Sequence, residues 1–165
     1  QSAREFHVAC AVGVELAPSR HRLALAELAR EVDLDDTLSG RVALIEGDCA
    51  DEVLWAGPLA GSTLVFAGSL LFGESLMARL ARCIEACESV RAVACLKRFA
   101  AAGGGAGTSA TGSGLAGFRE LPSEAFETSW TAPLRAGEGS GVRNPGAPVF
   151  LYIRGVVAAP ASDTG

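Results

Sequence analysis

The chain has 165 residues, enough for one domain with a substantial core, and its 49% hydrophobic and 20% charged residues are typical of a soluble globular protein. A net charge of -5 argues against broad phosphate binding, which depends on clustered Lys and Arg, so we expect no direct nucleic-acid site in this chain. Because no apolar run reaches the ~18 to 20 residues of a membrane span, and no signal-peptide layout precedes Glu15, we expect a soluble intracellular protein without a membrane partner.

The N-terminal part of the chain predicts strands that alternate with helices. Residues 1–8 resemble the tail of a helix. The elements expected next are a strand over 11–16, a helix from Pro18 with Ser19 as its N-cap, a strand over 42–45 and a weaker helix over 50–59. The first of these helices has one apolar face, because four of its residues recur at helical spacing, namely Leu25, Leu28, Ala29 and Val32.

The middle of the chain continues this alternation. A strand is expected over 63–67, a loop over 68–73 and a short apolar strand over 92–96. Between the loop and the last strand, a strong helix is predicted by Leu76, Leu80, Cys83, Ile84 and Cys87. Strands that alternate with helices require a parallel sheet that is covered on both faces.

The pattern changes after residue 100. Residues 100–117 are almost entirely Gly, Ala, Ser and Thr, with almost nothing to bury, and residues 135–147 are rich in Gly and Pro, so both predict mobile insertions. Strands are expected over 118–130 and 149–156, and two consecutive strands without a helix between them favour an antiparallel pair at the sheet edge.

These elements together predict an α/β fold of the Rossmann-like, doubly wound kind. We expect a mostly parallel sheet with a C-terminal antiparallel strand pair over residues 1–157, followed by a frayed tail over 158–165. The glycine loop of nucleotide-binding sheets normally lies ~20 residues before the ribose-binding acid. Counted back from Glu15, this loop falls before Gln1, so we expect the first strand and the glycine loop to be missing from the chain.

The cysteines and histidines show no metal-ligand pattern. No C-x-x-C pair is present, and no cysteine has ligand spacing with His7 or His21, so we expect ordinary reduced thiols and no metal site. Cys83 and Cys87 lie four residues apart on one helical face, which suits packing as well as a ligand pair. The two histidines and Trp55 are expected to be structural or surface residues.

Candidate ligand-binding residues lie where predicted strands end. An acid that ends the second strand of an open parallel sheet can accept both hydroxyls of an adenosine ribose, and Glu15 has this position; the alternative is a solvated strand end. Asp48 could accept the amino group of adenine while Cys49 offers its backbone N–H, although Gly-Asp is also an ordinary turn. Two acids without a basic phosphate clamp favour a cationic adenosine ligand without phosphate, and S-adenosyl-L-methionine fits that description.

Several stretches resemble a known family. They are Val12-Gly13-Val14-Glu15-Leu16, Pro18-Ser19-Arg20, Glu46-Gly47-Asp48, Val65-Phe66, Leu70-Leu71-Phe72-Gly73, Ser129-Trp130-Thr131 and Pro148-Val149. Together they look like the methyltransferase core of the disruptor of telomeric silencing family, the histone lysine methyltransferases that lack a SET domain.

The resemblance implies a nuclear chromatin regulator with a histone or nucleosome as its protein substrate. It implies that Glu15, Asp48 and Cys49 hold the adenosine of the cofactor. It also implies that the loop from Ser69 to Phe72 lies beside the methyl group and that Trp130 lines the channel for the target lysine. The catalytic candidates are therefore Ser69 and Trp130, with Ser69 and Phe72 also on the cofactor.

Departures from the family pattern keep other functions open. The family has two asparagines where Gly68 and Ser69 stand, and its final-strand tyrosine is Leu151 here, with Tyr152 on the opposite face of the strand. A catalytically inactive scaffold, or a methyltransferase for another substrate, is the first alternative. An oxidoreductase that uses a nicotinamide dinucleotide is another, but it leaves Asp48 and the terminal strand pair unexplained.

Overall fold

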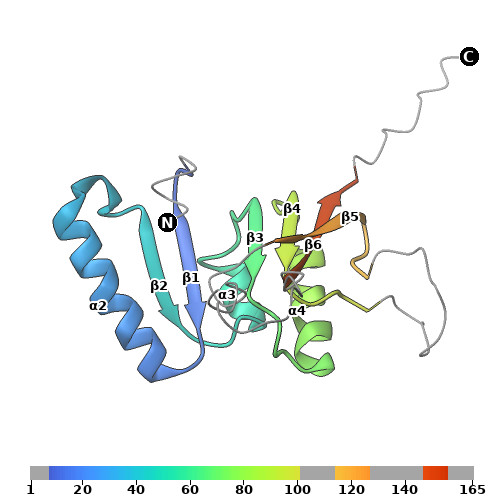
Figure 1. The fold of residues 1–165 in the computed structure, drawn as a ribbon, viewed down its shortest axis with the longest axis horizontal. Helices are drawn as coiled ribbons and strands as arrows, with labels where there is room; N and C mark the ends of the chain where they lie inside the picture. Colours follow the sequence, from blue (N-terminus) through green and yellow to red (C-terminus); the bar gives the residue numbers. More distant parts are fainter. Residues whose placement is uncertain (1–7, 101–113, 127–146, 156–165) are drawn as a thin grey trace, which may run out of the picture. The chain divides into compact units, whose positions relative to one another are not determined.

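The computed structural model describes residues 8–100, 114–126 and 147–155. The chain divides into two compact units, Gln1–Gly61 and Ser62–Gly165, and each contains a sheet with helices (Figure 1). The mixed α/β class is therefore confirmed. Several predictions lie outside the described residues: those for residues 1–7, most of the 100–117 insertion, Trp130, the 135–147 insertion up to residue 146, and the tail over 158–165. Residue 147 begins a strand.

The sheet of the first unit contains two parallel strands, β1 (Ala11–Glu15) and β2 (Val42–Glu46). Their register pairs Ala11 with Val42 and Glu15 with Glu46, so the two strands end side by side. Gly13 permits this packing, because a Cβ atom there would lie 2.8 Å from Cδ2 of Leu44. Both strands match the apolar runs that predicted them to within one residue.

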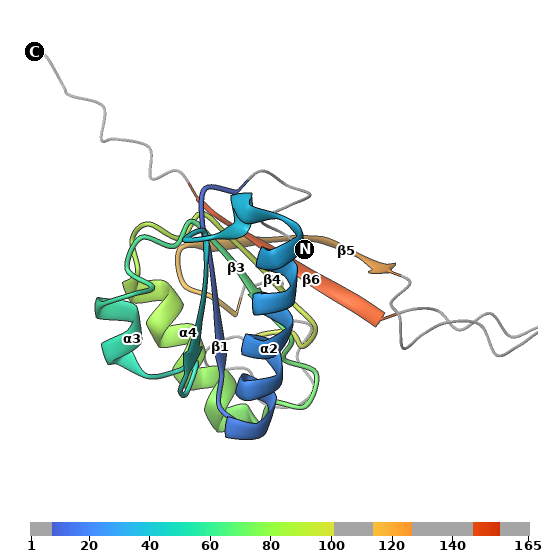
Figure 2. The ribbon, with the colours of Figure 1, turned by 90° about the vertical axis from the view of Figure 1, so that its left-hand side faces the viewer.

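One long helix, α2 (Pro18–Leu34), packs along these two strands (Figures 1 and 2). The helix begins at Pro18 after Ala17, which corrects the expected Ser19 cap: proline has no N–H to satisfy, and its fixed φ suits the first helical position. The half-buried side of α2 consists of His21, Ala24, Leu28, Glu31 and Val32.

The predicted apolar face of α2 is only partly correct. Leu28 and Val32 lie on the half-buried side, whereas Leu25 is 43% exposed and Ala29 is also exposed. No residue of α2 is fully buried, because a two-stranded sheet offers the helix only a narrow surface.

The rest of the first unit contains a 3-10 turn, Asp36–Leu38, and a short helix, α3 (Glu52–Ala56). The side chain of Asp51 caps α3 by accepting the Val53 N–H at 2.9 Å. This helix is shorter than the predicted 50–59. The buried residues of this unit are Leu38, Ala50, Trp55 and Leu59.

The second unit has a four-stranded mixed sheet in the order β3-β4-β6-β5. Its strands are β3 (Leu64–Ala67), β4 (Ala92–Cys95), β5 (Phe118–Phe126) and β6 (Ala147–Arg154). Strands β3 and β4 are parallel, and β6 runs antiparallel to both β4 and β5. The predicted antiparallel pair at the sheet edge is therefore confirmed. The pairing of β5 shifts between Leu121 and Glu124, beside Pro122, which has no N–H for the ladder.

The core of the second unit is built on α4 (Glu74–Ala86). The helical pattern predicted its buried side correctly at Leu80, Cys83 and Ile84. Leu115 is also buried, with 1% of its surface exposed. The expectation that residues 100–117 have almost nothing to bury is therefore wrong at Leu115. One apolar residue between glycines gives too weak a pattern to predict such an anchor.

Strand β6 presents neighbouring residues to opposite faces of the sheet. Tyr152 pairs with Val93 and is fully buried, whereas Leu151 pairs with Ala94 and is half-buried. The Tyr152 hydroxyl accepts the Phe99 N–H at 3.2 Å, and the two rings make an edge contact. Burial raises the pKa of Tyr152 well above its usual range. Tyr152 is therefore a structural residue, on the other face from Leu151 as predicted.

The cysteines are all free thiols: Cys83, Cys87 and Cys95 are buried, Cys49 is half-buried and Cys10 is exposed. Burial raises the pKa of Cys95 to about 11, so this thiol stays protonated at neutral pH. Within the described ranges, no helix combines the length and apolar character that crossing a bilayer requires.

Candidate functional site

Two of the predicted site residues lie at one edge of the first unit's sheet. Glu15 is the last residue of β1, and Asp48 follows the end of β2 by two residues. The Gly47 N–H donates to the Glu15 carbonyl at 3.0 Å, which extends the strand pairing beyond Glu46. Because β1 and β2 are parallel, the two acids share the carboxyl edge, where open α/β sheets bind ligands.

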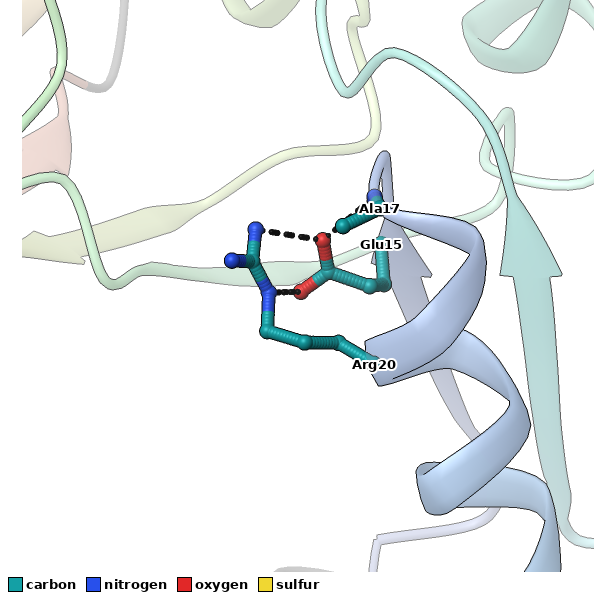
Figure 3. Close-up of polar contacts among 3 residues, drawn as sticks. All are labelled: Glu15, Ala17 and Arg20. Carbon is teal, nitrogen blue, oxygen red and sulfur yellow. Dashed lines mark hydrogen bonds and ion pairs between the residues drawn. The ribbon is translucent and has the colours of Figure 1, made fainter.

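The Glu15 carboxylate is held by three hydrogen bonds (Figure 3). Its Oε1 atom accepts the Ala17 N–H at 2.7 Å and Nη2 of Arg20 at 2.8 Å. Its Oε2 atom accepts Nε of Arg20 at 3.0 Å. The Arg20 guanidinium, followed by the Ala17 N–H, lowers the pKa of Glu15 from 4.5 to about 2. The carboxylate is therefore ionised and oriented at neutral pH.

The start of α2 produces this arrangement. Extended backbone at Ala17 directs its N–H toward the end of β1, and the helix that begins at Pro18 places Arg20 in its first turn. The pairing raises the pKa of Arg20 in turn. The Arg20 side chain remains 69% exposed and that of Glu15 32% exposed, so the ion pair lies at the surface. The sequence places Arg20 in a stretch that resembles the family, but its contact with Glu15 was not predicted. The signal that could have indicated the contact is an arginine five residues after a strand-ending acid.

A second acid and base meet beside this pair. Nδ1 of His21 lies 3.4 Å from Oε2 of Glu46, the residue that ends β2. The His21 side chain is 13% exposed, and its Nε2 atom is buried without a hydrogen-bond partner among the described residues. Arg20 and His21, successive residues of α2, thus face the ends of β1 and β2.

Asp48 and Cys49 lie in a well-ordered turn between β2 and α3. Oδ1 of Asp48 accepts the Ala50 N–H at 2.9 Å, and its carbonyl accepts the Asp51 N–H at 3.0 Å. The carbonyl of Cys49 accepts the indole N–H of buried Trp55 at 2.8 Å, which gives Trp55 the expected structural role. Asp48 therefore has the turn geometry that the sequence offered as the alternative, and its contact with adenine stays a prediction.

Ser69 and Phe72 belong to the second unit, in the loop between β3 and α4. Ser69 is fully buried, and its hydroxyl oxygen accepts the Lys97 N–H at 3.0 Å. The Ser69 carbonyl accepts the Phe72 N–H at 2.9 Å, which closes a tight turn. In this structure Ser69 thus holds the loop, and its predicted place beside a methyl group stays a prediction.

Lys97 fixes the same loop from the end of β4. Its Nζ atom donates to the Phe72 carbonyl at 2.6 Å and pairs with Oε1 of Glu74 at 2.8 Å. Lys97 is the sole lysine of the chain, and sequence reasoning gave it no role. The two leucines between Ser69 and Phe72 are exposed, Leu70 by 52% and Leu71 by 93%. The loop therefore has a fixed base and an apolar tip.

No protein-family model matches the chain, and no curated protein matches it either.

Proposed function

We propose that the protein is an S-adenosyl-L-methionine-dependent methyltransferase related to the nuclear histone lysine methyltransferases that lack a SET domain. The observation that carries the proposal is the pair of acids, Glu15 and Asp48, at the carboxyl edge of two adjacent parallel strands. A Rossmann-like, doubly wound sheet is part of this proposal, and the parallel strands and the α2 helix that follows β1 are compatible with it.

The acids suit the adenosine part of such a cofactor. An ionised carboxylate accepts hydrogen bonds only, so Glu15 matches the two donor hydroxyls of a ribose. Asp48 can accept the amino group of adenine beside the Cys49 backbone. The low pKa of Glu15 keeps it an acceptor over the physiological pH range.

The cofactor, when bound, supplies a methyl group on a positively charged sulfur. For transfer, the acceptor nitrogen must have a free lone pair aligned with that methyl group, and holding this geometry supplies much of the rate. An apolar channel lowers the pKa of a lysine and so favours its neutral form. The exposed Leu70 and Leu71 and half-buried Phe72 have the character of such a channel wall, and Trp130 is assigned to it by resemblance.

A methyl-transfer assay tests this function. The full-length protein is incubated with radiolabelled S-adenosyl-L-methionine and nucleosomes, and with a whole-cell lysate as a wider source of acceptors. We expect labelled histone, and less than a tenth of that label with Glu15→Gln.

A catalytically inactive scaffold is the second candidate function, and the buried Ser69 hydroxyl favours it. That oxygen accepts a backbone N–H where the family resemblance places two asparagine amides. The same assay separates the candidates: incorporation that depends on Glu15 excludes the scaffold. If no label is transferred but the protein still binds S-adenosylhomocysteine, the scaffold is supported.

A further inference from the structure

We propose that Arg20 is a displaceable counter-ion that competes with the ribose hydroxyls for Glu15 and thereby sets the affinity of the nucleoside site. This inference rests on the proposed function, because it takes Glu15 as the acceptor of the ribose. Its basis is the number of hydrogen bonds that Glu15 already accepts (Figure 3).

A carboxylate oxygen has about two lone pairs available for hydrogen bonds. Oε1 of Glu15 uses both, one for the Ala17 N–H and one for Nη2 of Arg20, while Oε2 accepts one bond from Nε of Arg20. A ribose presents two neighbouring hydroxyls, and gripping both with the two carboxylate oxygens requires one acceptor position on each. The Oε1 position must therefore be vacated before the full contact forms.

Arg20 is the donor that can leave. The Ala17 N–H is part of the backbone between β1 and α2, whereas the Arg20 guanidinium is at the end of a flexible side chain that is 69% exposed. Once released, the guanidinium is hydrated by solvent. An exposed ion pair is weak, so its displacement lowers nucleoside affinity by only about two- to fivefold.

The Arg20 to Glu15 contact also predicts which ligands are affected. A nucleoside without ribose hydroxyls does not use the Oε1 position, so Arg20 does not lower its affinity. The contact predicts a salt effect as well, because added salt weakens an exposed ion pair and so relieves the competition. Both effects require the ribose hydroxyls, so a purely structural role of Arg20 would produce neither.

The experiment is a calorimetric titration of the full-length protein with adenosine and with 2′,3′-dideoxyadenosine. Arg20→Gln is expected to bind adenosine two- to fivefold more tightly than the unmodified protein, and dideoxyadenosine equally. Arg22→Gln, an exposed arginine of the same helix, is the matched control and should change neither affinity. For the unmodified protein, adenosine affinity should rise between 50 mM and 500 mM salt, and this rise should vanish in Arg20→Gln.

The outcomes separate this inference from the function on which it rests. If Glu15→Gln leaves adenosine binding unchanged, the assigned nucleoside site is wrong. If Glu15→Gln weakens binding but Arg20→Gln does not strengthen it, the site stands and the competition is refuted. If Arg20→Gln weakens adenosine binding, Arg20 is a ligand contact and the proposal is overturned.

Discussion

Replacing Lys97 with Met tests whether one side chain holds the 68–73 loop closed. In the structure, Nζ of Lys97 donates to the Phe72 carbonyl at 2.6 Å and pairs with Glu74 at 2.8 Å. Because the Phe72 carbonyl can accept water once the loop opens, its hydrogen bond to Lys97 contributes only about 1 kcal/mol. Glu74 is 75% exposed, so its ion pair adds only ~0–1 kcal/mol. We expect loop opening to become easier by about 1–2 kcal/mol, a 5- to 30-fold change in population.

Hydrogen exchange at the Phe72 amide measures this opening directly. That amide donates to the Ser69 carbonyl at 2.9 Å inside the loop. We expect its exchange to accelerate about 5- to 30-fold in Lys97→Met, in proportion to the open population. Amides of β4 should keep their protection, because β4 remains paired with β3 and β6.

Arg82→Met, an exposed arginine of α4, is the matched control for the loss of a long cationic side chain. Unchanged Phe72 exchange in Lys97→Met would refute the argument that Lys97 closes the loop. Equal acceleration throughout the second unit would also refute it, since that result indicates global destabilisation.

Three further predictions concern stability, each measured by urea unfolding. The Arg154 guanidinium donates to three backbone carbonyls, those of Val90 at 2.7 Å, Cys87 at 2.9 Å and Ile84 at 3.1 Å. It also lies 4.4 Å from the centre of the Phe118 ring. Arg154→Met should therefore lower the free energy of unfolding by about 2–4 kcal/mol. An equal loss in Arg119→Met, at an exposed position, would contradict this. Gly114→Ala should cost about 3 kcal/mol or more, because its Cβ would clash with the Phe99 carbonyl, whereas Gly61→Ala meets nothing within 4 Å and should be mild. Because the folded pKa of Glu15 is depressed to about 2, its stabilising contribution is complete above pH 4.5 and is lost as the pH falls from 4.5 to 2. The stability difference between the unmodified protein and Glu15→Gln should therefore shrink over that range, and a constant difference would exclude the ion pair as its cause.

The sequence was most informative where local pattern decides structure. Runs of four or five apolar residues located the parallel strands, as at β2, although no residue of β2 is fully buried in its two-stranded sheet. The helical period located α4, whose buried side faces a full core. The same period placed Leu25 on the wrong side of α2. A helix that packs on only two strands buries little surface, so its leucines do not all lie on the packed side.

Contacts between side chains were less predictable. The resemblance placed Ser69 near a reacting methyl group, but no periodicity indicates that its hydroxyl would accept the N–H of a residue 28 positions away. Arg20 was visible in the sequence, yet its bidentate contact depends on how the chain turns between β1 and α2. A strand-ending acid thus predicts a candidate site, whereas the groups that already engage the acid require the structure.

Calorimetric titration of the full-length protein with S-adenosylhomocysteine tests the central claim, that the Glu15 carboxylate holds the ribose of an adenosine cofactor. Glu15→Gln keeps the size of the side chain but removes its charge, and Glu52→Gln, at an exposed position in the first turn of α3, is the matched control. Losing the charged acceptor of two hydroxyl bonds should lower the affinity at least about tenfold. We predict binding by the unmodified protein and by Glu52→Gln, with at least tenfold weaker binding by Glu15→Gln. Equal affinity in all three proteins would contradict the account.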